Sequence, residues 1–339
     1  MSRGRESVLA EIHGALAAMP RGRWLLAVSG GRDSMVLLDA MASARGHEVA
    51  AVATFDHGTG RAASRAAAMV VQEAEVRGLP VVQGLARADL AHSEAAWRTA
   101  RHRFLDGWAR ELEARVVTAH TRDDQIETVV LRLLRDSGPR GLAGMLATTT
   151  PGRIAELSSR ERVRPLITVS RASVHAFHAA RKLRVVEDPS NGRMDHARNR
   201  VRQEILPALE RVQPGFSDWC WDVSVRAAAL RAGLDSVVRE HVEVHTVADE
   251  QEPSQVVILK AAPFADLASD AWTALWPAVA ARAGVVMDRR GVTRASHWAP
   301  RSTVGQSIQL SGGASITRTR STFVLRGTPS ATPGYILYQ

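Results

Sequence analysis

The sequence contains one cysteine, Cys220, among its 339 residues. A single thiol excludes an internal disulfide, a four-cysteine zinc site and an iron–sulfur cluster held by cysteines of this chain. Long apolar runs are also lacking, because no stretch approaches the roughly 20 apolar residues that cross a bilayer. Residues 1–20 have no apolar core of the signal-peptide kind. We therefore expect a cytoplasmic protein with no membrane partner.

Lysine is nearly absent as well, since Lys182 and Lys260 are the only two. Arginine therefore carries almost all of the positive charge behind the formal net charge of +9. Because a guanidinium can bind phosphate in a bidentate manner, this composition favours a polyanionic partner such as nucleic acid. An anionic membrane or the base composition of the genome would explain the same bias. A hydrophobic content of 45% indicates a globular rather than a disordered chain.

Short apolar segments alternate with helical ones in the first 120 residues. We expect strands at 24–28, 49–55, 79–85 and 114–120, with helices beginning near residues 35, 64 and 93 between them. Apolar runs of this kind are typical of strands buried on both faces, and their alternation with helices predicts an α/β fold with a doubly wound, Rossmann-like parallel sheet. Ligands bind beyond the carboxyl ends of such strands. The two densest polar segments, 29–34 and 120–127, begin where expected strands end.

The rest of the chain predicts two further domains. A helix is expected over 171–182, and Pro214-Gly215 marks a boundary. Helical periodicity dominates 216–299, whereas 300–339 has short alternating runs around Ser311-Gly312-Gly313, which we interpret as a hairpin turn. We therefore expect a first domain at 1–215, a helical middle domain at 216–299 and a small β domain at 300–339.

The first polar segment is Ser29-Gly30-Gly31-Arg32-Asp33-Ser34. Two consecutive glycines allow a tight turn with exposed N–H groups, and the helix that follows adds its positive dipole, so the segment predicts an anion cradle. It is not a Walker A motif, because Gly-Lys-Ser/Thr is missing, and no third glycine completes a dinucleotide fingerprint. Asp33 would repel phosphate unless a cation such as Mg²⁺ lay between them. Alternatively, the serine and aspartate only cap an ordinary helix, and the glycines only turn the chain.

The second polar segment runs from His120 to Asp123, Asp124 and Glu127. Asp123 and Glu127 are four residues apart, so on a helix they share a face and can hold one ammonium or one metal ion together. The same acids could instead interact favourably with the positive end of the helix dipole, or pair with nearby arginines. Spacing alone does not choose between these interpretations.

Several motifs resemble known families. SGGRDS resembles the PP-loop of the N-type ATP pyrophosphatases, and residues 118–145, TAHTRDDQIETVVLRLLRDSGPRGLAGM, resemble a segment of bacterial tRNA(Ile)-lysidine synthases. Further motifs match that family in order, up to about residue 210: Asp56-His57-Gly58, Trp97-Arg98-Thr99-Ala100-Arg101-His102-Arg103-Phe104, Arg164-Pro165-Leu166, Glu187-Asp188-Pro189-Ser190-Asn191, Arg198-Asn199-Arg200-Val201-Arg202 and Leu206-Pro207. Thr121 stands where the family usually has a second histidine.

The resemblance implies a ligase that uses ATP and Mg²⁺. It would adenylate the wobble cytidine of isoleucine tRNA with a CAU anticodon, after which the ε-amine of L-lysine would displace AMP. The implied nucleotide site is Ser29, Gly30, Gly31, Arg32, Asp33 and Ser34, with Asp33 as metal ligand. The implied catalytic residues are Asp33, His120, Asp123, Asp124, Glu127, Arg98 and Arg101.

The resemblance also implies a tRNA contact at Arg198, Asn199, Arg200 and Arg202. Beyond Phe216 the resemblance thins, and we expect the helical domain at 216–299 to bind tRNA because of its basic charge. Which acidic residue binds lysine and which orients the metal stays open. One alternative is tRNA thiolation, which normally uses cysteines and therefore fits poorly with Cys220 alone. Another is a non-catalytic nucleotide-binding or RNA-binding module.

Overall fold

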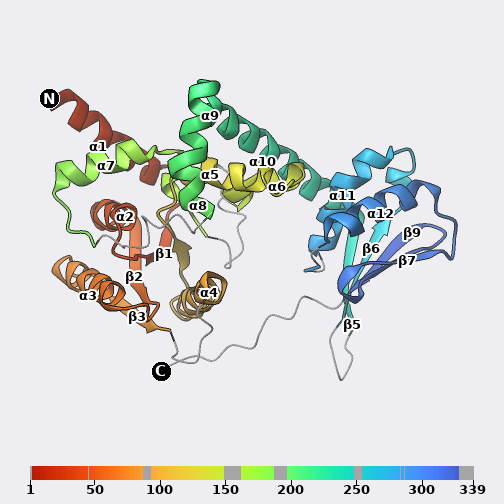
Figure 1. The fold of residues 1–339 in the computed structure, drawn as a ribbon. Coiled ribbons are helices and arrows are strands. Elements are labelled where there is room, and N and C mark those ends of the chain that lie inside the picture. The colour runs from red at the N-terminus through yellow and green to blue at the C-terminus, as the bar shows by residue number, and fades with distance from the viewer. Residues whose placement is uncertain are drawn as a thin grey trace. The chain divides into compact units, whose positions relative to one another are not determined.

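The computed structural model describes residues 2–44, 46–86, 93–148, 162–186, 197–247, 254–282, 284–285 and 287–327. The matched motif at 187–191 lies outside these residues. The chain forms two compact units (Figure 1). Among the described residues, unit 1 takes those up to Arg135 and Gly144–Ser224, and unit 2 takes Asp136–Ala143 and those from Val225 to Gly327.

Unit 1 contains a parallel sheet in the order β3-β2-β1-β4. Its strands are β1 (Gly22–Ala27), β2 (His47–Asp56), β3 (Val81–Leu85) and β4 (Arg115–Val117). Its longer helices are α1 (Ser2–Ala17), α2 (Arg32–Ser43), α3 (Arg61–Val76), α4 (Glu94–Glu111), α5 (Arg122–Leu133) and α7 (Arg171–Arg181). Leu26 shares a core with α2 and α7, whereas its neighbour Leu25 shares one with α4. Helices therefore cover both faces of the sheet, which confirms the predicted doubly wound fold.

The last part of unit 1 packs against α5. It comprises α8 (Ala197–Arg200), a π-helical turn at Val201–Ile205, α9 (Leu206–Val212) and the start of α10 (Phe216–His241). Two 3₁₀ turns, at Gly144–Thr148 and Pro165–Thr168, complete the unit. Cys220 is fully buried in a cluster with Ile126 and Val129 of α5, which fits a packing residue.

Unit 2 contains an antiparallel sheet in the order β5-β6-β9-β8-β7. Its strands are β5 (Val242–Val247), β6 (Ser254–Lys260), β7 (Ser307–Gln309), β8 (Ser315–Arg318) and β9 (Thr322–Gly327). Its helices are α6 (Pro139–Leu142), the part of α10 from Val225 to His241, α11 (Ser269–Arg282) and α12 (Arg289–Trp298), with 3₁₀ turns at Ala262–Phe264, Ala299–Arg301 and Ser311–Gly313. Trp272 and Trp276 stack in its core at 5.3 Å between ring centroids.

Two strands of unit 2 were not expected from the sequence. β5 and β6 lie within 216–299, which the periodicity assigned to helices, and β6 pairs with β9 beyond residue 300. Because the partner of β6 is so distant in sequence, no local pattern near β6 reveals this pairing. The expected turn at Ser311–Gly313 does connect β7 and β8. The expected domain boundaries stay predictions. None of the described helices is long and apolar enough to cross a membrane.

Candidate active site

The glycine-rich segment connects β1 to α2, as the sequence predicts. Gly30 has a φ of 83°, in the left-handed region that favours glycine, and a Cβ there would lie 3.0 Å from the Cβ of Ala66. Ser34 Oγ accepts a hydrogen bond from Ser29 N at 3.2 Å and donates one to Gly31 O at 2.8 Å. These bonds hold the turn closed at the N-terminus of α2, where backbone N–H groups are available to an anion.

Asp33 lies in the first turn of α2. Burial and the nearby charge of Asp124 raise the pKa of its carboxyl to about 6, against the lowering effect of Arg171, Arg202 and Arg32. No described residue donates a hydrogen bond to this carboxylate. A buried carboxylate whose ionised form is disfavoured gains stability from a cation, so the residues present fit a magnesium ion between Asp33 and a phosphate.

The acidic segment begins α5, with Thr121 as its N-cap. Asp124 closes a capping box, because its Oδ2 accepts hydrogen bonds from Thr121 N at 2.8 Å and from Thr121 Oγ1 at 3.1 Å. Thr121, whose position drew attention in the sequence, therefore starts the helix. Asp123 Oδ2 accepts the backbone N–H of Arg171 at 2.7 Å, which joins the start of α7 to the start of α5.

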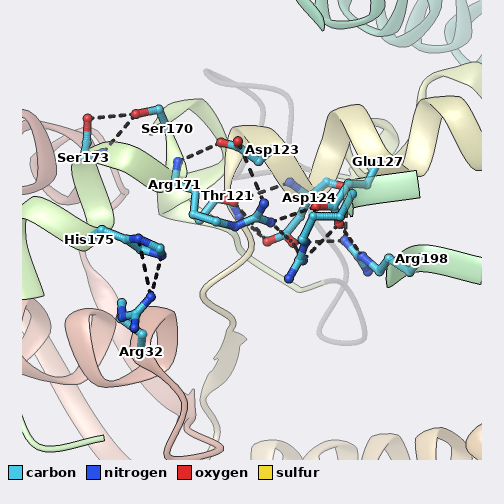
Figure 2. Close-up of polar contacts among 11 residues, drawn as sticks. Arg32, Thr121, Asp123, Asp124, Glu127, Ser170, Arg171, Ser173, His175 and Arg198 are labelled. Atoms are coloured by element: carbon cyan, nitrogen blue, oxygen red, sulfur yellow. Dashed lines mark hydrogen bonds and ion pairs between the residues drawn. The ribbon is translucent and has the colours of Figure 1, made fainter. Parts of the chain in front are cut away.

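Three arginines converge on the other acids of α5, and Figure 2 labels two of them, Arg171 and Arg198. Glu127 Oε1 accepts from Arg171 Nη2 at 3.0 Å and Arg202 Nε at 2.7 Å, and Oε2 accepts from Arg198 Nε at 2.8 Å and Arg202 Nη2 at 3.1 Å. Asp124 Oδ1 accepts from Arg171 Nη2 and Arg198 Nη2, both at 3.1 Å. Burial opposes ionisation of both acids, but these arginines outweigh it and lower their pKa values.

The two other residues of the predicted tRNA contact, Asn199 and Arg200, lie in different environments. Asn199 is buried, whereas Arg200 is exposed and lies 3.8 Å from Glu204 on the next turn. Arg198 and Arg202, predicted to contact tRNA, have carboxylate partners in this structure.

His120 is a neutral imidazole at physiological pH, because burial and then the charge of Arg164 lower its pKa to about 3. Its Nδ1 lies 2.9 Å from Thr118 Oγ1. His102, on α4, has its pKa lowered to about 4 by burial and by Arg162 and Arg101. Burial is the larger cause of both shifts, and the charges of the neighbouring arginines add to it.

Asp33, Asp124, His102, His120 and the three arginines of α7, α8 and the π-helical turn line one cavity of about 1540 Å³ in unit 1. Pockets for small molecules usually measure about 300 to 1,000 Å³, so the volume exceeds that needed for a nucleotide alone. Two aspartates, Asp33 and Asp124, line it together with ten arginines: Arg32, Arg98, Arg101, Arg132, Arg135, Arg162, Arg164, Arg171, Arg198 and Arg202. Such a lining favours a large anionic substrate.

The structure brings most of the predicted site residues into this one cavity, whose lining includes Ser29, Gly31, Arg32, Asp33, Ser34, Arg98, Arg101, His120 and Asp124. Gly30, Asp123 and Glu127 are not among the residues that line it. The sequence did not single out Arg171 or His175, which lie one turn apart on α7 (Figure 2). Arg32 Nη1 of the glycine-rich segment lies 2.8 Å from His175 Nε2. The only signal for Arg171 is its place at the start of an expected helix, which does not reveal that the helix points at α5.

Comparison with known proteins agrees with this geometry. The family model of the PP-loop domain matches residues 5–209. The tRNA(Ile)-lysidine synthase of Salinispora arenicola is 41% identical over 230 residues, which cover 65% of this chain and 67% of that relative. That of Geobacter sulfurreducens is 34% identical over 241 residues, 68% of this chain and 50% of the relative. The chain belongs to the tRNA(Ile)-lysidine synthase family of PP-loop proteins.

The match spans between half and two thirds of the length of these two relatives. Among solved structures, the U34-tRNA thiolase NcsA from Methanococcus maripaludis, solved with its [4Fe-4S] cluster, is similar to this chain with a TM-score of 0.53 and 13% identity. That match covers 66% of this chain and 78% of the thiolase. At this identity the likeness concerns the fold alone.

Proposed function

We propose that the chain is an ATP-dependent tRNA(Ile)-lysidine synthase that acts in the cytoplasm. The wobble cytidine of isoleucine tRNA with a CAU anticodon would attack the α-phosphate of ATP through its C2 oxygen and release pyrophosphate. The ε-amine of L-lysine would then attack C2, and AMP would leave. The observation that carries the proposal is an arginine-lined cavity that is lined both by the glycine-rich segment and by His120 and Asp124 at the start of α5.

The residues of the glycine-rich segment supply the nucleotide site in this proposal. The N-terminus of α2 and the turn at Gly30 and Gly31 would bind the phosphates through backbone N–H groups. Asp33 would hold Mg²⁺, which when bound neutralises phosphate charge. His120, being neutral, would exchange hydrogen bonds with the substrates rather than attract phosphate by charge.

The arginines around the cavity would bind the other anions. Arg98 and Arg101, on α4, would stabilise charge on the reacting phosphates or on the nucleotide to be modified. Arg200 is exposed and suits a phosphate of the tRNA backbone, which positions the substrate without reading its sequence. The anticodon loop is single-stranded, so the target base can enter the cavity at modest energetic cost.

Incorporation of labelled lysine tests the proposal directly. The purified full chain is incubated with ATP, Mg²⁺, labelled L-lysine and isoleucine tRNA that carries the CAU anticodon. The matched control is the same tRNA with uridine in place of the wobble cytidine. We expect label in the first tRNA and none in the control. Pyrophosphate release without lysine incorporation would indicate a different tRNA-modifying reaction, and no ATP turnover at all would indicate a non-catalytic binding module.

A further inference from the structure

A buried carboxylate of unit 1, that of Asp39 on α2, lies outside the cavity and joins three helices. Asp39 is 6% exposed. Its Oδ1 accepts a hydrogen bond at 3.0 Å from Nη2 of Arg77, which caps α3, and its Oδ2 accepts one at 2.8 Å from Nε of Arg181, the last residue of α7. Burial alone would raise the pKa of Asp39, but the two arginines outweigh it and hold the pKa below its ordinary value. The carboxylate therefore stays ionised and bridges α2, α3 and α7.

Two further contacts extend this cluster to the chain that follows α7. Arg77 Nη1 donates to Glu73 Oε2 at 2.7 Å, so the arginine is fixed on α3 as well as on Asp39. Arg184 Nη1 donates to Gln72 Oε1, also on α3, at 2.8 Å. The chain that leaves α7 is therefore tied to α3 three residues beyond the end of the helix.

The tied segment leads directly to the glycine-rich turn. Val186 N donates to Gly30 O at 3.0 Å, and Val185 and Val186 line the cavity. On its other side Gly30 lies against α3, where a Cβ on Gly30 would be 3.0 Å from the Cβ of Ala66. The turn is thus held between α3 and the chain that follows α7.

We propose that Asp39 is a positioning residue, whose bonds to Arg77 and Arg181 form a latch that fixes the register of α7 on α2 and brings residues 183–186 to Gly30. The latch itself binds no ligand. Its effect on ATP rests on the proposed function. Its effect on residues 183–186 does not, because the exchange of a backbone amide can be measured without any substrate.

Apolar packing alone does not fix the register of the two helices. The helices α2 and α7 share a hydrophobic core, but hydrophobic contact has no preferred direction along a helix. Polar contacts do have one, and they occur at two levels, between Arg32 and His175 and between Asp39 and Arg181. At a rise of about 1.5 Å per residue, these levels are about 10 Å apart along α2 and about 9 Å apart along α7. The two spacings match, so both contacts form in one register of the helices.

The latch can be opened without leaving a buried charge unpaired. In Asp39→Asn, Arg77 keeps Glu73 as its carboxylate partner. Arg181 has a half-exposed side chain, so its guanidinium can be solvated once the carboxylate is gone. We therefore expect this variant to fold, with α7 and residues 183–186 less firmly held.

Amide hydrogen exchange in the full chain, resolved at Val186, tests the latch. The variants are Asp39→Asn and Arg181→Gln, and the matched control is Glu48→Gln, which removes the exposed acid of an ion pair with Arg23 elsewhere in unit 1. In both latch variants we expect the Val186 amide to exchange about tenfold faster or more, since a hydrogen bond to a charged group is worth at least about that factor. The amides of β1 and β2 should exchange as in the unchanged chain, and Glu48→Gln should leave Val186 unaltered.

Two outcomes of this measurement would overturn the latch. One is unchanged exchange at Val186 in a folded Arg181→Gln protein. The other is an equal rise in exchange throughout unit 1, which a general loss of stability produces without any positioning role. Arg181→Lys keeps a positive donor at the same place and should restore slow exchange at Val186. If Asp39→Asn does not fold, Arg181→Gln carries the measurement.

Substrate kinetics separate positioning from a general loss of structure. Because the latch acts on the glycine-rich turn, the latch variants should raise the KM for ATP about tenfold and leave the KM for lysine within about twofold of the unchanged chain. Equal changes in both constants, or an unchanged KM for ATP, would show that the latch does not position the nucleotide site. If the unchanged chain shows no reaction with ATP, the proposed function fails, and the exchange at Val186 still decides the latch.

Discussion

Replacing Asp33 by asparagine should make the protein more stable and inactive at once. The folded state raises the pKa of Asp33 from its ordinary 3.8 to about 6, so its ionised form is disfavoured by folding. One pKa unit corresponds to about 1.36 kcal/mol, which gives a penalty of up to about 3 kcal/mol at neutral pH. Asparagine has nearly the same shape and no charge, and therefore removes this penalty. For a unit of this size the gain corresponds to a rise in Tm of about 5 to 10 °C.

The direction of the pKa shift determines how the stability difference between the two proteins changes with pH. Because the folded pKa lies above the unfolded one, the penalty is present above pH 6 and disappears as the pH falls from about 6 to 3.8. Calorimetric unfolding of both proteins in EDTA at pH 7.5, 6, 5 and 4 should show the asparagine variant more stable at pH 7.5 and the two equal near pH 4. ATP with Mg²⁺ should stabilise only the unchanged chain. An asparagine variant that is no more stable at pH 7.5 would refute the reasoning.

Three further predictions concern the turn, the thiol and the surface. Gly30→Ala should destabilise unit 1 by about 1 to 2 kcal/mol, because of its positive φ and the contact with Ala66, and weaken ATP binding in a nucleotide-binding assay. Cys220→Ser should lower the free energy of unfolding by about 1 to 3 kcal/mol, measured by chemical unfolding, because a hydroxyl replaces a fully buried thiol. It should keep its activity, since burial raises the pKa of the thiol to about 11 and leaves it unreactive. A folded but inactive variant would show that the thiol takes part in the reaction. Arg290→Gln and Arg326→Gln, both exposed in unit 2, should each lower the slope of log K against log salt for tRNA binding by roughly 0.7 to 0.9, and unchanged slopes would show that these arginines do not touch tRNA.

The part of the fold that could be predicted is the part with local signals. β1 and β2 are apolar runs buried on both faces, and the glycines and the capping residue announce the starts of α2 and α5. β5 and β6 gave no such signal, because they follow a 26-residue helix, and β6 is paired on its other edge with β9, far along the chain. Their identity depends on pairing, which sequence periodicity does not contain.

The candidate site shows the same division. The residue types of Ser29 to Ser34 and of Asp123 to Glu127 predict a shared site, because both segments follow strands of one parallel sheet. The arginine partners of Glu127 could not be predicted, since Arg171 comes from a helix that only tertiary packing brings to α5. The spacing of Asp123 and Glu127 suggested a shared ligand, yet in the structure Asp123 binds a backbone N–H and Glu127 binds side chains.

The pairing of β6 with β9 has a consequence for how the chain folds during synthesis. Lys260 pairs with Thr322, so about 60 residues must be made after β6 before its central partner exists. The sheet of unit 1 is complete once β4 at Arg115–Val117 has been made. Because domains fold as units from the N-terminus and distant pairings form slowly, unit 1 should acquire its sheet while unit 2 still lacks one. During that interval the apolar strand β6, with Val257 and Leu259 destined for the core, is the segment most in need of protection from aggregation.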